Sequence, residues 1–255
     1  MSPTYVLGYK IIPLPAGIAG ELFCRIIDRG YFVWVFAKFS IAMVTLMAVE
    51  RWFAIARPAS YKFVFKRQRA VLYAMSLLSF SAVTNLNLLF DIKLEMKKSL
   101  PACVFHSSFA TKETDQIFTI MYCTLTVFVP LLATTATYIH LRFVIGGQSR
   151  IENFRTQQLE VKLTRMSAIV ALCIVICFVP NQISYILTKF DLYTYNAPQS
   201  LFTVVLAMTN SCINPWIYFC TNKTYRKEFI QFFCPRRRNE VGLFRVTMSS
   251  SEPGK

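Results

Sequence analysis

The chain has 255 residues, of which 55% are hydrophobic, and a formal net charge of +15 at neutral pH. A soluble domain is about 45–50% apolar, so this composition argues against a soluble protein. The positive charge could indicate a nucleic-acid partner, but the basic residues lie in three blocks (residues 51–69, 142–165 and 223–255) and not along one helix face. We therefore expect a protein that is embedded in the lipid bilayer and has no nucleic-acid partner.

Five long stretches between the charged blocks are apolar enough to cross a hydrocarbon core, which takes about 20 residues per helix. In chain order, the expected spans are residues 26–56, 68–90, 116–145, 160–188 and 198–220, followed by an amphipathic helix at 222–233 and a disordered tail at 236–255. Prolines inside the spans are expected to kink them, because neighbouring helices in a bundle can bond the carbonyls that a proline leaves free. The predicted fold class is an all-α membrane protein with five spans.

The orientation of the spans follows from the three basic blocks. All three fall on one side of the membrane, and lysine and arginine are enriched in cytoplasmic loops. The loops at residues 91–115 and 189–200 then lie outside, and the C-terminus lies in the cytoplasm. The sequence therefore predicts a multi-pass protein, which we place in the plasma membrane.

Short motifs lie at characteristic places in this series of spans. They are Glu50–Arg51–Trp52 at the end of the first span, Pro130 and Tyr138 in the third, Cys177–Phe178–Val179–Pro180 in the fourth, Asn214–Pro215–Trp216–Ile217–Tyr218 in the fifth, and Cys234 after the amphipathic helix. In order and spacing, these motifs resemble helices three to seven and the short eighth helix of the rhodopsin-like G-protein-coupled receptors. The resemblance covers residues 24–234, and it implies a seven-helix receptor bundle of which five spans are present.

The resemblance implies an activation switch at the cytoplasmic ends of the spans. Arg51 is expected to bridge Glu160 while the receptor is silent and to engage the heterotrimeric G protein on activation. The residues assigned to this switch are Glu50, Arg51, Trp52, Tyr138, Glu160, Asn214, Pro215 and Tyr218. An arginine at this place can also be one more cytoplasmic positive charge, and this alternative stays open.

A second set of residues corresponds to the activation core of the family, which relays the change along the bundle. It comprises Ser40, Ile41, Pro130, Ile174, Phe178, Pro180 and Asn210. Pro180 would supply the bend on which the fourth span pivots, and Phe178 stands where the family usually has tryptophan. For the apolar members, ordinary packing between helices is the alternative explanation.

Two cysteines on the outer side are expected to form a disulfide. Cys24 precedes the first span and Cys103 lies in the next outer loop, so both are in an oxidising compartment. By resemblance, the bond ties this loop to the helix end. The interval from Cys24 to Arg51 is slightly longer than is common in the family, but it still permits the bond. Cys234 is a candidate for palmitoylation, with a free cysteine as the alternative.

The ligand is expected to bind among residues on the outer halves of the spans. The pocket candidates are Val33, Trp34, Ala37, Lys38, Tyr122, Thr126, Asn181, Gln182, Tyr185, Val204 and Met208. Val33 stands where amine receptors have an aspartate, which argues against a monoamine, and the last span has no lysine for a retinal Schiff base. The mixture of aromatic and amide side chains favours a peptide. No cofactor, metal or enzymatic activity is expected, since the two histidines, His106 and His140, lie on opposite sides of the membrane.

Lys38 is the unusual member of this set, because an ionisable group in mid-span costs about 2.5–3.5 kcal/mol on insertion scales. One hypothesis is that Lys38 meets an acidic group of the ligand or an acid in a helix that this sequence lacks. The other is that it hydrogen-bonds Thr126 and nearby carbonyls. Both interpretations stay open at the level of the sequence.

Residues 1–23 resemble only the loop before the third helix of the family. The first two helices are therefore expected to be absent, and this polypeptide alone is expected to fold poorly. One function that fits is a receptor that transduces binding of an extracellular ligand into G-protein activation, with this sequence a part of it. The alternative is a truncated, non-signalling isoform or gene fragment that associates with full-length receptors. Upstream coding sequence for two more spans would distinguish the two.

Overall fold

The computed structural model describes residues 17–28, 30–97, 100–105, 109–147, 154–193, 198–221 and 223–233. The chain divides into two compact units, Met1–Ile213 and Asn214–Lys255, and each is considered by itself. The predicted disordered tail at 236–255 and Cys234 lie outside the described residues, so the predictions made for them stay predictions.

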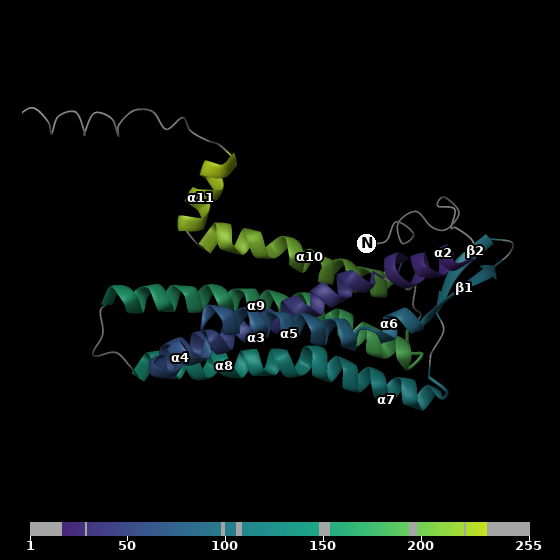
Figure 1. Ribbon diagram of the computed structural model, residues 1–255, viewed down its shortest axis with the longest axis horizontal. Coiled ribbons are helices and arrows are strands. Elements are labelled where there is room, and N and C mark those ends of the chain that lie inside the picture. Colours follow the sequence, from purple (N-terminus) through teal and green to yellow (C-terminus); the bar gives the residue numbers. More distant parts are fainter. Residues whose placement is uncertain are drawn as a thin grey trace, which may run out of the picture. The chain divides into compact units, whose positions relative to one another are not determined.

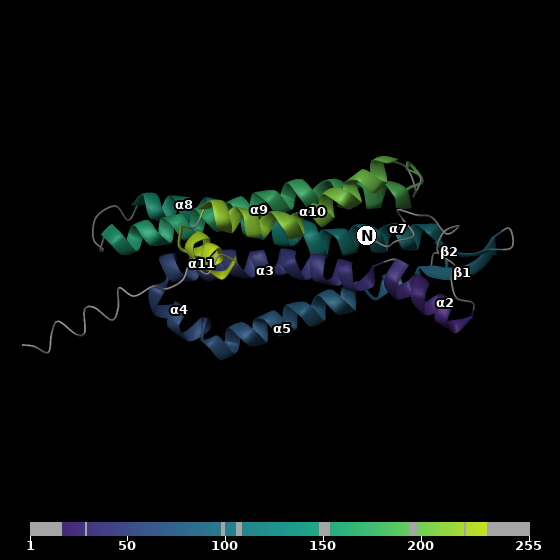
Figure 2. The ribbon, with the colours of Figure 1, turned by 90° about the horizontal axis from the view of Figure 1, so that it is seen from above.

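Four long helices form the body of the first unit and lie lengthwise beside one another (Figures 1 and 2). They are α3 (Tyr31–Ala56), α5 (Arg67–Thr84), α8 (Val129–Gly147) and α9 (Phe154–Lys189), and α3 contacts the other three. The shorter helix α7 (Lys112–Cys123) runs through a π-helical turn, η2 (Thr124–Phe128), into α8. The buried side chains where α3, α8 and α9 meet include Ile41, Val44, Ala48, Leu141, Val170 and Ile174.

The helices have the length and composition of membrane spans. Within the described residues, four segments qualify, namely Ile18–Ala56, Arg67–Phe90, Lys112–Ile145 and Thr164–Lys189. Their outer faces expose large apolar side chains, for example Leu72 and Met75 on α5, as lipid-facing surfaces do. The fifth expected span corresponds to α10 (Pro198–Thr221), an uncharged helix of 24 residues. Its polar residues lower its hydropathy, and its passage through the membrane stays a prediction.

Prolines mark the irregular points of the helices. Pro180 and Pro215 lie inside α9 and α10 as expected. Pro130 is the second residue of α8, just after the π-helical turn η2, and a residue without an amide hydrogen interrupts the regular hydrogen-bond ladder there. Pro58 begins the short helix α4 (Pro58–Val64), since its fixed φ suits the first helical position and its missing amide hydrogen is not needed there.

The loop between α5 and α7 contains a β-hairpin that the sequence analysis did not anticipate. After the one-turn helix α6 (Asn87–Phe90), strand β1 (Ile92–Lys97) pairs antiparallel with β2 (Leu100–Phe105), and Leu94 lies opposite Cys103. In β1, apolar residues alternate with charged ones, and this period of two is typical of a strand with one covered face. Only the side of the membrane on which this loop lies was considered in the sequence analysis, which is why this signal was missed.

A disulfide between Cys24 and Cys103 joins the hairpin to the start of α3, which confirms the expected pair. Cys24 lies in the π-helix η1 (Phe23–Asp28), which follows α2 (Ile18–Leu22). Cys24 and Ile92 are fully buried, and Phe23 and Leu94 pack against them. Gly30 directly precedes α3 and separates it from η1. Its φ of 64° is a left-handed conformation, which glycine adopts without strain.

The second unit contains the end of α10 and the helix α11 (Lys223–Phe233). Phe229 on α11 packs edge-on against Phe219 of α10, at 5.5 Å between ring centroids, and stacks on Tyr225 at 6.1 Å. Phe229, Ile230 and Phe232 are exposed. Basic residues share the helix with these apolar ones, so α11 has the amphipathic character that was expected of the stretch after the last span.

Candidate functional site

A buried lysine lies at the centre of a polar cluster between α3, α7 and α9. The Lys38 side chain is only 3% exposed, and its Nζ atom donates a hydrogen bond of 2.7 Å to Oε1 of Gln182 on α9. The same ammonium lies 5.2 Å from the centroid of the Tyr122 ring, a distance at which a cation is attracted to an aromatic face. Gln182 in turn donates from Nε2 to Oδ1 of Asn181 at 3.1 Å. Four predicted pocket residues are thus brought together.

The Tyr122 ring is held in place from its other end. Its hydroxyl donates to Oδ1 of Asn85 at 2.7 Å, and Asn85, which is fully buried, donates from Nδ2 to the carbonyl of Ser81 at 2.7 Å. This chain of hydrogen bonds links α7 to the C-terminal end of α5. It fixes the orientation of the ring beside Lys38. The cluster is therefore held together by residues from α3, α7 and α9 and by the C-terminal end of α5.

The hydrogen-bond partner of Lys38 is not Thr126, which was one of the two alternatives that the sequence left open. The Thr126 hydroxyl donates to the carbonyl of Tyr122, four residues earlier, at 2.7 Å, and the hydrogen bond of the ammonium is made to Gln182 instead. A threonine in a helix commonly bonds the carbonyl one turn back. Within the described part of the chain, no carboxylate lies within ion-pair distance of Lys38. Among the described residues, the cation therefore contacts the neutral groups Gln182 and Tyr122.

The other pocket candidates lie at varied depth. Tyr185, Trp34 and Ala37 are half-buried, as are Val204 and Met208 on α10, and Val33 is exposed on α3. Ser184 of α9 and Ser200 of α10 share a hydrogen bond of 2.9 Å, which joins these two helices near their ends within the first unit. The structure does not group Val33 with Lys38 among its described contacts, and the role of Val33 stays a prediction.

The Glu50–Arg51–Trp52 motif lies at the opposite end of α3. Nη2 of Arg51 is 3.4 Å from Oε1 of Glu50, and the same oxygen accepts a hydrogen bond of 3.0 Å from the Tyr61 hydroxyl on α4. Trp52 donates from Nε1 to Nδ1 of His140 on α8 at 3.0 Å. The side chain of Glu160 lies outside the described part of α9, and its bridge to Arg51 stays a prediction.

The contact between Tyr61 and Glu50 leads to a first prediction. Replacing Tyr61 by phenylalanine removes a hydrogen bond to a carboxylate at a half-buried site. We therefore expect the free energy that holds α4 against α3 to fall by about 1 kcal/mol. Hydrogen exchange of the amides of residues 59–64 in detergent-solubilised protein should become several-fold faster. The matched control is Tyr193→Phe, at an exposed tyrosine. Unchanged exchange in α4 would show that Tyr61 does not hold this helix.

The residues of the expected activation core are mostly deep in the first unit. Ile41, Ile174 and Phe178 are buried, and Ser40, Pro130 and Pro180 are half-buried. Asn210 is also buried, and its Oδ1 atom has no hydrogen-bond donor within the described residues. Asn214 and Tyr218 belong to the second unit, and their side chains lie outside the described part of the structure. Tyr138 lies half-buried on α8, and its place in the relay stays a prediction.

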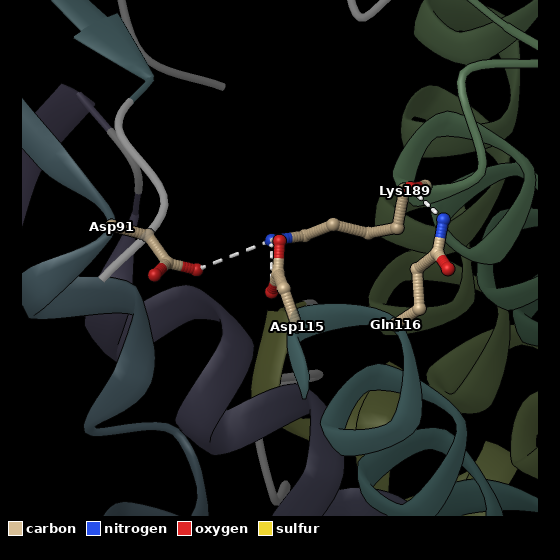
Figure 3. A network of polar contacts seen from close by, with 4 residues as sticks. All are labelled: Asp91, Asp115, Gln116 and Lys189. Atoms are coloured by element: carbon tan, nitrogen blue, oxygen red, sulfur yellow. Dashed lines mark hydrogen bonds and ion pairs between the residues drawn. The ribbon is translucent and has the colours of Figure 1, made fainter. Parts of the chain in front are cut away.

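Three charged residues form a buried network that the sequence analysis did not assign to any site. Lys189, at the end of α9, extends between Asp115 of α7 and Asp91, which lies between α6 and β1 (Figure 3). All three lie at the ends of the loops 91–115 and 189–200, which are expected from the sequence to lie outside. Asp115 and Lys189 are adjacent to the expected span ends, but no spacing along the chain indicates that these charges meet.

The long apolar helices and their lipid-facing surfaces define the chain as an all-α, multi-pass membrane protein. Residues 14–218 match the family model of the 7 transmembrane receptor (rhodopsin family). This match covers most of the chain, and the chain therefore belongs to that family. The family comprises receptors and not enzymes, which confirms the expected class and fold.

Similar proteins include several named receptors. The chain is 23% identical to the allatostatin-A receptor of Bombyx mori, over 89% of this chain and 64% of that protein. It is 25% identical to the somatostatin receptor type 5 of Bos taurus, over 84% and 59%, and 26% identical to the substance-K receptor of Homo sapiens, over 83% and 57%. The chain thus spans about 57–64% of the length of these relatives.

Proposed function

We propose that this chain is part of a G-protein-coupled receptor in which a ligand bound between α3, α7 and α9 controls a G-protein site at the cytoplasmic end of α3. The observation that carries the proposal is that one helix bears both features. Lys38 and the Arg51 motif lie on α3, roughly 20 Å apart at 1.5 Å per residue. A rigid helix that contacts α5, α8 and α9 can transmit a shift at one end to the other.

The ligand that we propose is a peptide with an acidic group. Aromatic and amide side chains surround Lys38, and they suit the mixed polar and apolar surface of a peptide. The named relatives are receptors for allatostatin-A, somatostatin and substance K. A buried ammonium without a carboxylate partner within the described residues is a functional candidate, and an acidic ligand group would supply the missing charge. Visual pigments also match the chain, but α10 has no lysine to hold retinal.

The orientation in the membrane is part of the same proposal. The disulfide-tied hairpin and the Lys38 cluster belong to the outer half, and Glu50, Arg51 and α4 face the cytoplasm of the cell. The basic blocks support this arrangement through the enrichment of lysine and arginine in cytoplasmic loops. The G protein is the proposed partner on that side, and palmitoylation of Cys234 would anchor the segment after α11.

The proposal is tested by nucleotide exchange on a purified heterotrimeric G protein with the chain in lipid nanodiscs. Since the chain alone is expected to fold poorly, the correctly folded fraction is isolated first. For this fraction we expect exchange above that of empty nanodiscs, and a loss of about tenfold in the Arg51→Ala variant, since coupling energies between such sites are typically about 1–3 kcal/mol. The matched control is Arg67→Ala, an exposed arginine at the start of α5 that lies in the same basic block. Correctly folded chain without exchange above the empty nanodiscs would contradict signalling and favour the non-signalling isoform.

A further inference from the structure

The buried charges at the outer end of the first unit come from three separate segments. Nζ of Lys189 lies 2.9 Å from both carboxylate oxygens of Asp115 and 3.7 Å from Oδ2 of Asp91. The three side chains are 5%, 10% and 3% exposed, respectively. Figure 3 shows the lysine side chain extended between the two carboxylates. One ammonium thus ties the end of α9 to the first turn of α7 and to the residue that precedes the β1–β2 hairpin.

Further contacts reinforce the connection between α7 and α9. Gln116, next to Asp115, donates from Nε2 to the backbone carbonyl of Lys189 at 3.3 Å. The Lys189 ammonium also lies 5.9 Å from the centroid of the Tyr185 ring, one turn back on α9. The end of α9 is therefore held by its side chain and by its backbone at once.

These contacts lie at one end of a polar seam between the two helices. On α9, Gln182, Tyr185 and Lys189 recur at intervals of three and four residues and so share a face. On α7, Asp115, Thr119 and Tyr122 do the same. The seam therefore runs from Lys189 at its outer end to the Lys38 cluster at its inner end. Thr119 lies between them, and its hydroxyl is buried without a hydrogen-bond partner among the described residues.

We propose that Asp91, Asp115 and Lys189 form an outer latch that closes the α7–α9 seam over Lys38 and holds the hairpin beside it. Opening the latch would be the step that gives a ligand access to Lys38. The role of the latch in ligand entry rests on the proposed function, whereas its closing of the seam does not. The latch is a regulatory contact of the ligand site and takes no part in the G-protein site.

The burial of the three charges explains why the latch has two distinct states, closed and open. Taking one partner away leaves an uncompensated charge in a site of low dielectric, so the network is either complete or open and hydrated. A second ion pair joins the same two segments nearby, between Lys112 and Asp191. Its side chains are 61% and 71% exposed, and pairs so exposed contribute little because water and salt screen them. The Lys112–Asp191 pair therefore serves as the control, because breaking it is not expected to open the seam.

The test compares the buried and the exposed pair in detergent-solubilised or nanodisc-embedded protein. In Lys189→Gln and in Asp115→Asn we expect hydrogen exchange of residues 92–97 and 112–118 to become at least about tenfold faster, while Lys112→Gln stays like the parent chain. In a Thr119→Cys background, thiol labelling of position 119, followed by peptide mass spectrometry, should rise by a similar factor in the latch variants. This second measurement reports the opening of the seam and not only a looser hairpin.

Two further variants keep the proposal falsifiable. Asp91→Asn weakens the longer of the two ion pairs of Lys189 and should give a smaller increase in exchange. This variant tests the latch even if Lys189→Gln and Asp115→Asn do not fold. The charge swap Asp115→Lys with Lys189→Asp should restore protection, at least in part. Equal exchange in Lys189→Gln and Lys112→Gln, or no change in labelling at position 119, would overturn the latch. Neither readout depends on G-protein activity, so a failure of the latch is distinguishable from a failure of the proposed function.

Discussion

Replacing both Cys24 and Cys103 by serine is expected to lower the free energy of unfolding by about 2–5 kcal/mol, the usual cost of losing a native disulfide. The bond closes a loop with a sequence separation of 79 residues, so its loss frees a long stretch of the unfolded chain. It also removes the covalent tie between the hairpin and the start of α3, where Cys24 and Ile92 form a small buried core. Thermal unfolding of the detergent-solubilised protein measures the effect.

The control for the disulfide is a cysteine that makes no such bond. Cys212 on α10 is free and exposed, and Cys212→Ser should unfold at the temperature of the parent chain. Reducing agent should lower the unfolding temperature of the parent chain and leave that of the double-serine variant unchanged. If the double-serine variant unfolds together with the parent chain under oxidising conditions, the hairpin is held by its packing alone.

Replacing Gln182 by leucine should destabilise the chain, whereas replacing Lys38 by methionine should not. Leucine at position 182 leaves a buried ammonium without its acceptor, and losing a hydrogen bond to a charged group costs about 1.5–3 kcal/mol. Methionine at position 38 removes the charge itself, and exchanging a buried charge for an apolar group of similar volume is often neutral or stabilising. The double variant should therefore unfold close to the parent chain. Thermal unfolding of all three variants gives the result.

The matched control for this series is Gln68→Leu, the same substitution at an exposed position of α5. Equal stability of Gln182→Leu and the parent chain would mean that Lys38 finds another partner. The variants also separate stability from signalling, because Lys38→Met should keep the fold and lose the response to an acidic peptide. A retained response in Lys38→Met would exclude Lys38 as the anchor of the ligand.

The helices are the part of the fold that composition alone could predict. A stretch without charge that is long enough to cross the bilayer must form a helix there, because lipid offers its backbone no hydrogen-bond partners. Within the described residues, four helical segments are long and apolar enough to cross a membrane for this reason, and the prolines inside them could be foreseen to be tolerated. The resemblance to the receptor family supplied the Cys24–Cys103 pair. The alternation of Ile92, Leu94 and Met96 with charged residues could have predicted β1 as well.

The contacts of the polar residues were decided by the tertiary structure. Lys38 and Gln182 are 144 residues apart, and Lys189 and Asp115 are 74 apart. Local periodicity shows which face of a helix is apolar, but it does not show which polar group of another helix will lie opposite. For that reason the sequence singled out Lys38 but left its partner open between an acidic group and Thr126. It assigned Asp91, Asp115 and Lys189 to no site. The packing of α3, α7 and α9 determines these partners, because a buried charge must be matched by whatever polar group the bundle brings within reach.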